Sequence, residues 1–289
     1  IPDLITMLDN VLQNFIDSVE GKSGYSKAAY SAMRERSIGL GAMGFHSYLQ
    51  KNNIAFESMY ASSFNNKAFS YIKDRASATT RKLAEERGEA PDMEGSGKRN
   101  AHLLAIAPNA SSSIICGGTS PSIEPNRANV YTHKTLSGSF NVRNKYLKKI
   151  LQKYKKDTDE VWSSITTNQG SVSHLDFLTA EEKDTFKTAF EIDQRWIVEL
   201  GADRTPHISQ AQSINVFVPA DIHKKELHDI HFQAWKKGLK SLYYCRSKSI
   251  QRAENVQAGS STDVTKNVYS KEQESNNKDN NYEECLSCQ

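Results

Sequence analysis

Apolar residues recur at helical spacing in the first third of the chain. In the segment 4–19 they share one face, at Leu4, Leu8, Leu12, Phe15 and Val19. This spacing predicts a helix with one buried side. A second helix is predicted over roughly 65–87, and it is expected to end at Gly88 because glycine commonly terminates helices.

Short apolar runs that alternate with helical patterns fill the rest of the domain. Strands are predicted in HLLAIAP (102–108), NVYTH, SGSFNV, SINVFV (213–218) and LKSLYY. Helices are predicted in KYLKKILQKY, DQRWIVELGAD and ELHDIHFQAWKKG. Thr179 and Glu182 form a capping box that predicts one more helix, through Phe190. Since strands that alternate with helices form βα units, the sequence predicts an α/β fold with a mainly parallel sheet or barrel.

The chain becomes strongly polar from about Arg246 onwards. Only 37% of its 289 residues are hydrophobic, and the mean hydropathy is −0.63. Residues 246–289 explain part of this deficit, because they are rich in Ser, Asn, Lys, Glu and Gln and carry few large apolar side chains. Such a segment cannot bury enough surface to offset its ordering entropy. We therefore expect an α/β domain over 1–245 and a flexible tail over 246–289.

Charge, hydropathy and cysteine content exclude several classes of protein. The net charge is only +3 and the cations are spread along the chain, which does not indicate nucleic-acid binding. No apolar run approaches the length of about 18 residues that indicates a membrane helix. The chain has four cysteines, a small number for its size, which favours reduced thiols in the cytoplasm over a disulfide framework.

The segment GLGAMG (39–44) matches the G-x-G-x-x-G pattern of dinucleotide-binding turns. Such a turn should follow a strand, whereas the preceding residues, YSAMRERSI, are polar and indicate a helix. The alternative is that the glycines allow backbone segments to pack closely. The sequence favours close packing.

A small, hydroxyl-rich loop follows the predicted strand HLLAIA. Its residues are Pro108, Asn109, Ala110, Ser111 and Ser112. The carboxyl end of a strand is where α/β folds bind ligands, and backbone N–H groups and serine hydroxyls can hold a phosphate. An ordinary polar turn is the alternative interpretation.

Two adjacent tyrosines, Tyr243 and Tyr244, end the last predicted strand. Such a pair usually packs partly in a core and partly at its rim. The alternative is a radical relay, because a phenol can lose an electron and a proton together and pass the hole to a neighbouring phenol.

Cys285 and Cys288 form a Cys-x-x-Cys pair at the end of the polar tail. Two thiols at this spacing can close into a disulfide and reopen by exchange. They could also form half of a zinc site, but a second ligand pair at suitable spacing is missing. His228 and His231 are more consistent with a solvated helix face than with a metal site, so no metal is predicted.

Several of these motifs occur in one order that resembles a known family. They are RSIGLGAMGFHSYL, APNASSSI, SIEP, QAQSINVFV, FQAWKKGLKSLYY and the terminal Cys-x-x-Cys. Over nearly its whole length the chain resembles the large subunit of class I ribonucleotide reductase. The resemblance implies a ten-stranded α/β barrel of two five-stranded parallel halves. This chain is similar to the second half, followed by a disordered tail.

The same resemblance implies roles for the candidate residues. Residues 108–112 match the loop that binds the phosphates of a ribonucleoside diphosphate. Tyr243 and Tyr244 match the stacked pair that passes a radical from the metal-containing small subunit to the active-site cysteine. Cys285 and Cys288 match the pair that reduces the active-site disulfide again and is itself reduced by thioredoxin or glutaredoxin. The implied activity is the radical-based reduction of ribonucleotides to deoxyribonucleotides for DNA synthesis.

The sequence departs from the family at the thiyl cysteine. The family carries this residue in an Asn-x-Cys-x-Glu loop, and none of the four cysteines here has that context; Cys116 and Cys245 match no catalytic position. We therefore expect an N-terminal half-chain as partner, which would also hold the dNTP and ATP effector sites, and no cofactor in this chain. The alternatives are a non-catalytic α/β binding protein with a thiol or zinc-binding tail, and a nucleotide-dependent oxidoreductase built on GLGAMG.

Overall fold

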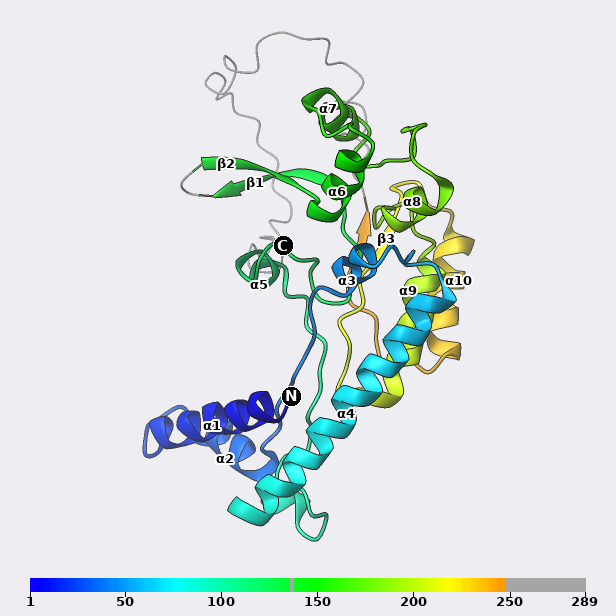
Figure 1. The fold of residues 1–289 in the computed structure, drawn as a ribbon. Helices are drawn as coiled ribbons and strands as arrows, with labels where there is room; N and C mark the ends of the chain where they lie inside the picture. Colours follow the sequence, from blue (N-terminus) through cyan, green and yellow to red (C-terminus); the bar gives the residue numbers. More distant parts are fainter. Residues whose placement is uncertain (136–137, 248–289) are drawn as a thin grey trace, which may run out of the picture.

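The computed structural model describes residues 1–135 and 138–247, and Figure 1 shows their arrangement. The longer helices are α1 (Pro2–Val19), α2 (Ser26–Glu35), α4 (Met59–Arg87), α9 (Gln194–Arg204) and α10 (Lys224–Lys236). The shorter ones are α3 (Phe45–Lys51), α5 (Ala110–Ile115), α6 (Lys145–Lys153), α7 (Asp159–Thr167) and α8 (Ala180–Thr185). The strands are β1 (Val130–Thr135), β2 (Gly138–Arg143), β3 (Val216–Val218) and β4 (Cys245–Ser247).

Extended segments that pair in parallel run through the middle of the molecule. Segment 38–40 pairs with 102–105 through the bridge between Leu40 and Leu104, and the next bridge joins Ile106 to Gln212. The chain continues from Gln212 into β3, which pairs in parallel with β4. The order of the segments in space therefore follows their order in the sequence, which confirms the predicted α/β class with parallel pairing.

Three predicted strands differ from the observed ones. The strand predicted over 213–218 is regular only in β3, at Val216–Val218. The run HLLAIAP makes isolated bridges in place of a regular strand. In LKSLYY, residues 239–242 are irregular; pairing starts where the Tyr243 N–H donates to the Ile214 carbonyl (2.8 Å), and β4 begins at Cys245. Strand β4 thus extends to Ser247, beyond the boundary predicted at 245.

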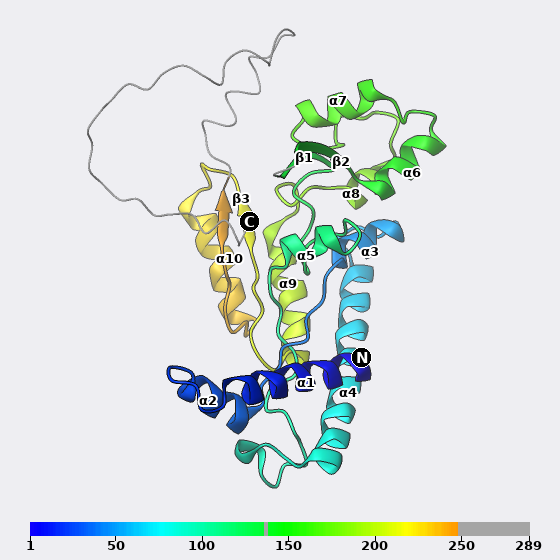
Figure 2. The same ribbon diagram turned by 90° about the vertical axis from the view of Figure 1, so that its left-hand side faces the viewer.

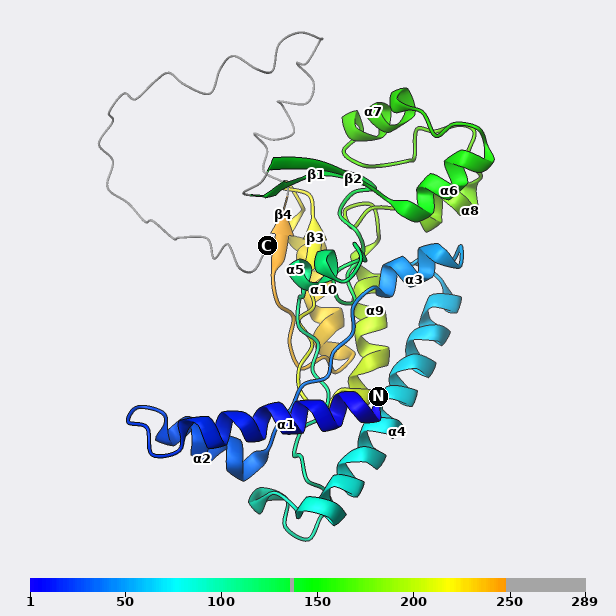
Figure 3. The same ribbon diagram turned by 60° about the vertical axis from the view of Figure 1, so that its left-hand side comes forward.

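Helices cover one side of the extended segments. Helix α4, with 29 residues, contacts α9, which in turn contacts α10 and β3 (Figures 1 and 2). It ends at Gly88 as predicted. Helix α1 crosses the lower part of α4 (Figure 3). Its predicted buried face is confirmed in part: Val19 is buried and Leu8 and Leu12 pack against the core, whereas Leu4 and Phe15 are exposed. Ile5, which is outside the predicted set, is fully buried.

The β1–β2 hairpin and helices α6, α7 and α8 form a smaller upper lobe (Figure 3). The two strands pair antiparallel, with Val130 opposite Arg143. The lobe has its own core, which includes Leu147, Leu151, Trp162, Ile165 and Phe186. The Thr179–Glu182 capping box is present.

Helix α8 was predicted to reach Phe190, but it ends at Thr185. The chain turns there because its apolar residues serve two cores. Phe186 is fully buried in the upper lobe, and Ala189 is fully buried in the main core beneath it. A continuous helix could not place them in both.

Candidate active site

The predicted phosphate loop follows Ile106 and leads into the short helix α5. Asn109 is the N-cap residue, and its Oδ1 is buried without a hydrogen-bond partner. Ser111 and Ser112 are exposed, whereas the buried Ser113 hydroxyl donates to the Ala110 carbonyl (2.6 Å). The Asn109 and Ala110 N–H groups donate to the Ala107 and Pro108 carbonyls. The donors that remain at the start of α5 are therefore the N–H groups of Ser111 and Ser112, beside their two exposed hydroxyls.

Tyr243 and Tyr244 lie in direct contact just before β4. Their ring centroids are 4.2 Å apart with an angle of 56° between the rings, and each side chain is a little under half exposed. The backbone of the pair is fixed by segment 214–216: the Tyr244 N–H donates to Asn215 Oδ1 (3.0 Å). The two phenols are therefore held in contact with each other and partly open to a partner.

Glu124 is a buried carboxyl beside this pair. Asn215 Nδ2 donates to Glu124 Oε1 (2.5 Å), so one asparagine side chain links Glu124 to the Tyr244 backbone. The Arg246 guanidinium lies 5.1 Å from the centre of the Tyr244 ring. Burial raises the pKa of Glu124, and the charges of Arg127 and Arg246 and the Asn215 bond oppose this only in part.

Arg127 completes the charged surroundings of Glu124. Its guanidinium lies 5.9 Å from the centre of the Phe217 ring. Burial, followed by the like charge of Arg246, lowers the pKa of Arg127, although part of its side chain remains exposed. Sequence reasoning had identified a turn at Glu124 and Pro125 without a role; the available signal was an acidic residue directly between the apolar Ile123 and Pro125.

The structure brings these features to neighbouring segments of the sheet. Residues 108–112 leave the segment that pairs at Gln212, and Tyr243 and Tyr244 pair along 214–216. The segment 212–218 therefore separates the loop from the tyrosine pair and carries Asn215, which contacts Glu124.

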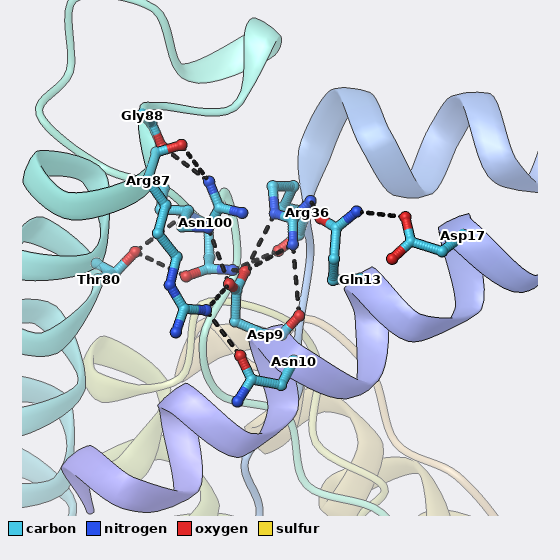
Figure 4. Close-up of polar contacts among 10 residues, drawn as sticks. Asp9, Asn10, Gln13, Asp17, Arg36, Thr80, Arg87, Gly88 and Asn100 are labelled. Carbon is cyan, nitrogen blue, oxygen red and sulfur yellow. Dashed lines mark hydrogen bonds and ion pairs between the residues drawn. The ribbon is translucent and has the colours of Figure 1, made fainter.

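A second buried carboxylate, Asp9, lies near the amino ends of the paired segments 38–40 and 102–105, and Figure 4 shows its polar contacts. Its side chain is fully buried and accepts from Arg36 Nε (3.1 Å), Arg87 Nη1 (2.9 Å) and Arg99 Nε (2.8 Å). Asn100 Nδ2 donates to it as well (3.1 Å). Arg36 and Asn100 directly precede segments 38–40 and 102–105, so this cluster fixes where the two segments begin.

The arginines decide the protonation state of Asp9. Burial alone would raise its pKa, but the hydrogen bonds and charges of Arg99 and Arg36 outweigh burial and lower it. Asp9 is therefore a carboxylate at neutral pH. Sequence reasoning did not identify this cluster, because nothing near Asp9 in the sequence marks it as buried.

The glycines of GLGAMG allow close backbone contact. A Cβ on Gly41 would lie 2.8 Å from the Ala105 carbonyl oxygen, and one on Gly44 would lie 2.6 Å from Thr119 Oγ1. The N–H groups of Gly44 and Phe45 donate to carbonyls of the 120–122 segment and so are not available to a phosphate. These contacts support the packing interpretation over the dinucleotide one.

The remaining candidates give no metal site in the part of the chain that is described. No group of three or more His, Cys, Asp or Glu side chains there could hold a metal ion. His228 stacks on Phe232, and His231 Nδ1 bonds to the Leu227 carbonyl. Cys285 and Cys288 lie outside the described residues. Across 1–135 and 138–247, no helix is both long and apolar enough to cross a membrane.

Comparison with known proteins gives a consistent result. The family described as "Ribonucleotide reductase, barrel domain" matches residues 2–98 and 90–245. The large subunit of ribonucleoside-diphosphate reductase from Invertebrate iridescent virus 6 is 48% identical over 260 residues, covering 89% of this chain and 27% of that protein. The putative large subunit from Frog virus 3 is 50% identical over 245 residues, covering 84% and 43%.

A solved structure is similar as well. The Actinobacillus ureae class Id ribonucleotide reductase alpha subunit superposes with a TM-score of 0.82 at 39% identity, covering 89% of this chain and 47% of that one. The chain thus spans less than half the length of these relatives.

Proposed function

The chain belongs to the ribonucleotide reductase large-subunit family, and from this premise we propose that it is part of a ribonucleoside-diphosphate reductase. The complete enzyme would reduce ribonucleoside diphosphates to deoxyribonucleotides for DNA synthesis. The observation that carries the proposal is the contact between Tyr243 and Tyr244, with the buried Glu124 linked to Tyr244 through Asn215. Two phenols in contact can pass an electron hole, and a carboxyl of raised pKa can exchange the accompanying proton.

The loop 108–112 is proposed to bind the substrate's diphosphate. Ser111 and Ser112 expose their hydroxyls, and the first-turn N–H groups of α5 point away from the helix toward its N-terminus. The buried Asn109 Oδ1 lacks a protein partner; because it is an acceptor, a hydroxyl of the ligand could donate to it, whereas the phosphate oxygens could not. No lysine or arginine is required for such a site, because N–H groups and hydroxyls suffice.

The chemistry also needs groups that this chain lacks. In the proposed reaction a thiyl radical on an N-terminal half removes the 3′ hydrogen atom of the ribose and returns it at the end of the cycle. In between, the 2′ hydroxyl is protonated and leaves as water, and two thiols supply two electrons and two protons and become a disulfide. A metal-containing small subunit would supply the radical, and effector nucleotides would bind the N-terminal half. Cys285 and Cys288 would reduce that disulfide by exchange and be reduced by thioredoxin or glutaredoxin, in the reducing cytoplasm.

The test is a Tyr→Phe series in an enzyme assembled from this chain, an N-terminal half and a small subunit of a relative. Tyr243→Phe and Tyr244→Phe should each reduce deoxyribonucleotide formation to background, because phenylalanine has no hydroxyl to oxidise. Substrate binding and the urea midpoint should stay unchanged.

Tyr48→Phe is the matched control. Tyr48 is exposed to a similar extent and stacks on Phe64 at 4.0 Å, but it lies on α3, away from the sheet pairing. It should keep full activity. Activity that survives in Tyr243→Phe or Tyr244→Phe would refute the radical-relay function.

A further inference from the structure

Helix α3 binds the part of the loop that comes just before Glu124. Ser47 and Ser120 exchange two hydrogen bonds: the Ser47 N–H donates to Ser120 Oγ (3.0 Å), and the Ser120 N–H donates to Ser47 Oγ (2.8 Å). The Phe45 N–H donates to the Ser122 carbonyl (3.3 Å). Ser47, Ser120 and Ser122 are all buried. The backbone of residues 120–122, which leads to Glu124, is therefore fixed by buried hydrogen bonds to α3.

The same helix also binds the part of the loop that comes just after Glu124. The Asn126 N–H donates to His46 Nδ1 (2.9 Å), and Asn126 Nδ2 donates to Gln50 Oε1 (3.1 Å). His46 and Gln50 are each only 1% exposed. Two consecutive turns of α3 thus bind the loop both before and after Glu124.

His46 keeps the same hydrogen-bonding role across the physiological pH range. Burial lowers the pKa of His46 to about 3, and the nearby Thr185 carbonyl opposes this shift only in part. The other ring nitrogen, Nε2, is buried without a hydrogen-bond partner. The imidazole is therefore neutral between about pH 5 and pH 8. Its Nδ1 remains an acceptor for the Asn126 N–H.

The loop between these anchor points adopts a backbone that it would not keep alone. Ser122 has a φ of 47°, in the left-handed region that residues other than glycine rarely occupy. The Glu124 N–H closes a tight turn onto the Pro121 carbonyl (2.9 Å). Strained backbone of this kind persists only where the surroundings over-determine it. Here the surroundings are α3.

We propose that His46, Ser47 and Gln50 are positioning residues of the radical-transfer site: α3 sets the place of Glu124 against Asn215 and the tyrosine pair. This inference rests on the proposed function for its catalytic meaning. Its structural content is that the buried environment of Glu124 depends on the α3 contacts. The α3 contacts described above go to the 120–126 loop, so α3 would act on the tyrosine pair through this loop.

The experiment measures the Glu124 carboxyl directly. The full chain is labelled with ¹³C at the Glu side-chain carboxyl, and the Glu124 signal is identified by its loss in Glu124→Gln. In the wild-type chain this carboxyl should titrate above the ordinary range. His46→Leu removes the acceptor, so water should reach Glu124 and its pKa should fall toward the ordinary value.

Conservative and control variants separate positioning from general destabilisation. His46→Asn places an amide oxygen near the position of Nδ1 and should restore the wild-type titration. Ser47→Ala, a smaller change, should lower the Glu124 pKa as well, and it carries the test by itself if His46→Leu does not fold. Lys51→Ala, at the exposed end of α3, should change nothing.

The assembled enzyme supplies a second readout. His46→Leu should lower kcat by roughly 10- to 100-fold, the scale of a small misplacement of a reacting group, with little change in KM. A folded His46→Leu chain with an unchanged Glu124 titration and unchanged kcat would overturn the inference. If the assembled wild-type enzyme reduces no nucleotide, the proposed function fails, whereas the Glu124 titration still decides whether α3 positions this residue.

Discussion

Asp9 and Glu124 are both buried carboxyl groups, with 0% and 6% of their residue surface exposed. Their surroundings move the pKa in opposite directions. Asp9 accepts hydrogen bonds from the guanidinium groups of three arginines, and its pKa is lowered. Glu124 accepts one short hydrogen bond from the neutral amide of Asn215, while its arginines act from farther away, and its pKa is raised.

The difference distinguishes a structural carboxylate, Asp9, from a carboxyl group that is proposed to exchange a proton, Glu124. A buried carboxylate whose charge is balanced by ion pairs and hydrogen bonds remains ionised and stays in one position. A buried carboxyl that is compensated only in part has a raised pKa and binds a proton more readily than an exposed one, which suits the proton exchange proposed beside the tyrosine pair. Asp9 anchors the amino ends of two paired segments, and Glu124 lies beside the residues proposed to react. The structural anchor and the proposed site thus lie at different ends of the paired segments.

The largest expected effect is the loss of stability in Asp9→Asn. The substitution keeps the size of the side chain but leaves the guanidinium groups of Arg36, Arg87 and Arg99 without a counter-charge. Breaking a buried ion pair from one side costs about 3–5 kcal/mol, so the free energy of unfolding in urea should fall by that amount. Asp17→Asn, on an exposed turn of the same helix, is the matched control and should cost little. A loss below about 1 kcal/mol in Asp9→Asn would show that the cluster is not a structural anchor.

The helices could be predicted from the sequence because their signal is local. Periodicity identified α1, α4, α9 and α10, and the capping box identified the start of α8. The buried face of α1 was wrong in part, since Leu4 and Phe15 are exposed. That face is set by Asp9, whose partners Arg36 and Arg99 lie 27 and 90 residues away in the sequence. No local pattern contains such a contact.

The candidate site likewise has a part that could be predicted from local sequence and a part that depends on contacts between distant residues. Tyr243 and Tyr244 are adjacent in the sequence, so a pair of phenols in contact could be predicted, and the structure has them in contact. The surroundings of Glu124 could not be predicted, because Asn215 lies 91 residues further along the chain. The short helix α8 and the late start of β4 likewise depend on which core or segment a residue meets after folding.

Glu124→Gln should have the second-largest effect. It should lower the activity of the assembled enzyme and leave the stability of the chain almost unchanged. Glutamine keeps an oxygen to accept from Asn215 but cannot ionise, so turnover of the assembled enzyme should fall by about 100-fold, the lower end of general acid–base effects. The urea midpoint at pH 7 should stay the same or rise slightly, because a buried charge has been removed. A variant that unfolds more easily but turns over normally would reverse the assignment of roles to the two carboxyl groups.

The smallest effects are changes of stability with pH, and they should occur in separate windows. The Asp9 pKa is lowered from 3.8, so its contribution is present above pH 3.8 and is lost as the pH falls through the lowered value. The Glu124 pKa is raised from 4.5, so its contribution is present below pH 4.5 and is lost as the pH rises through the raised value.

Urea unfolding of both variants between pH 7 and pH 3 checks this. On acidification, the advantage of Glu124→Gln over wild type should shrink first and be gone below about pH 4.5, while the deficit of Asp9→Asn should stay constant there and shrink only below about pH 3.8. One unit of pKa difference corresponds to about 1.4 kcal/mol, which is within reach of this measurement. If both differences shrank in the same window, the two carboxyl groups would share one electrostatic environment, and the contrast between the two ends of the sheet would fail.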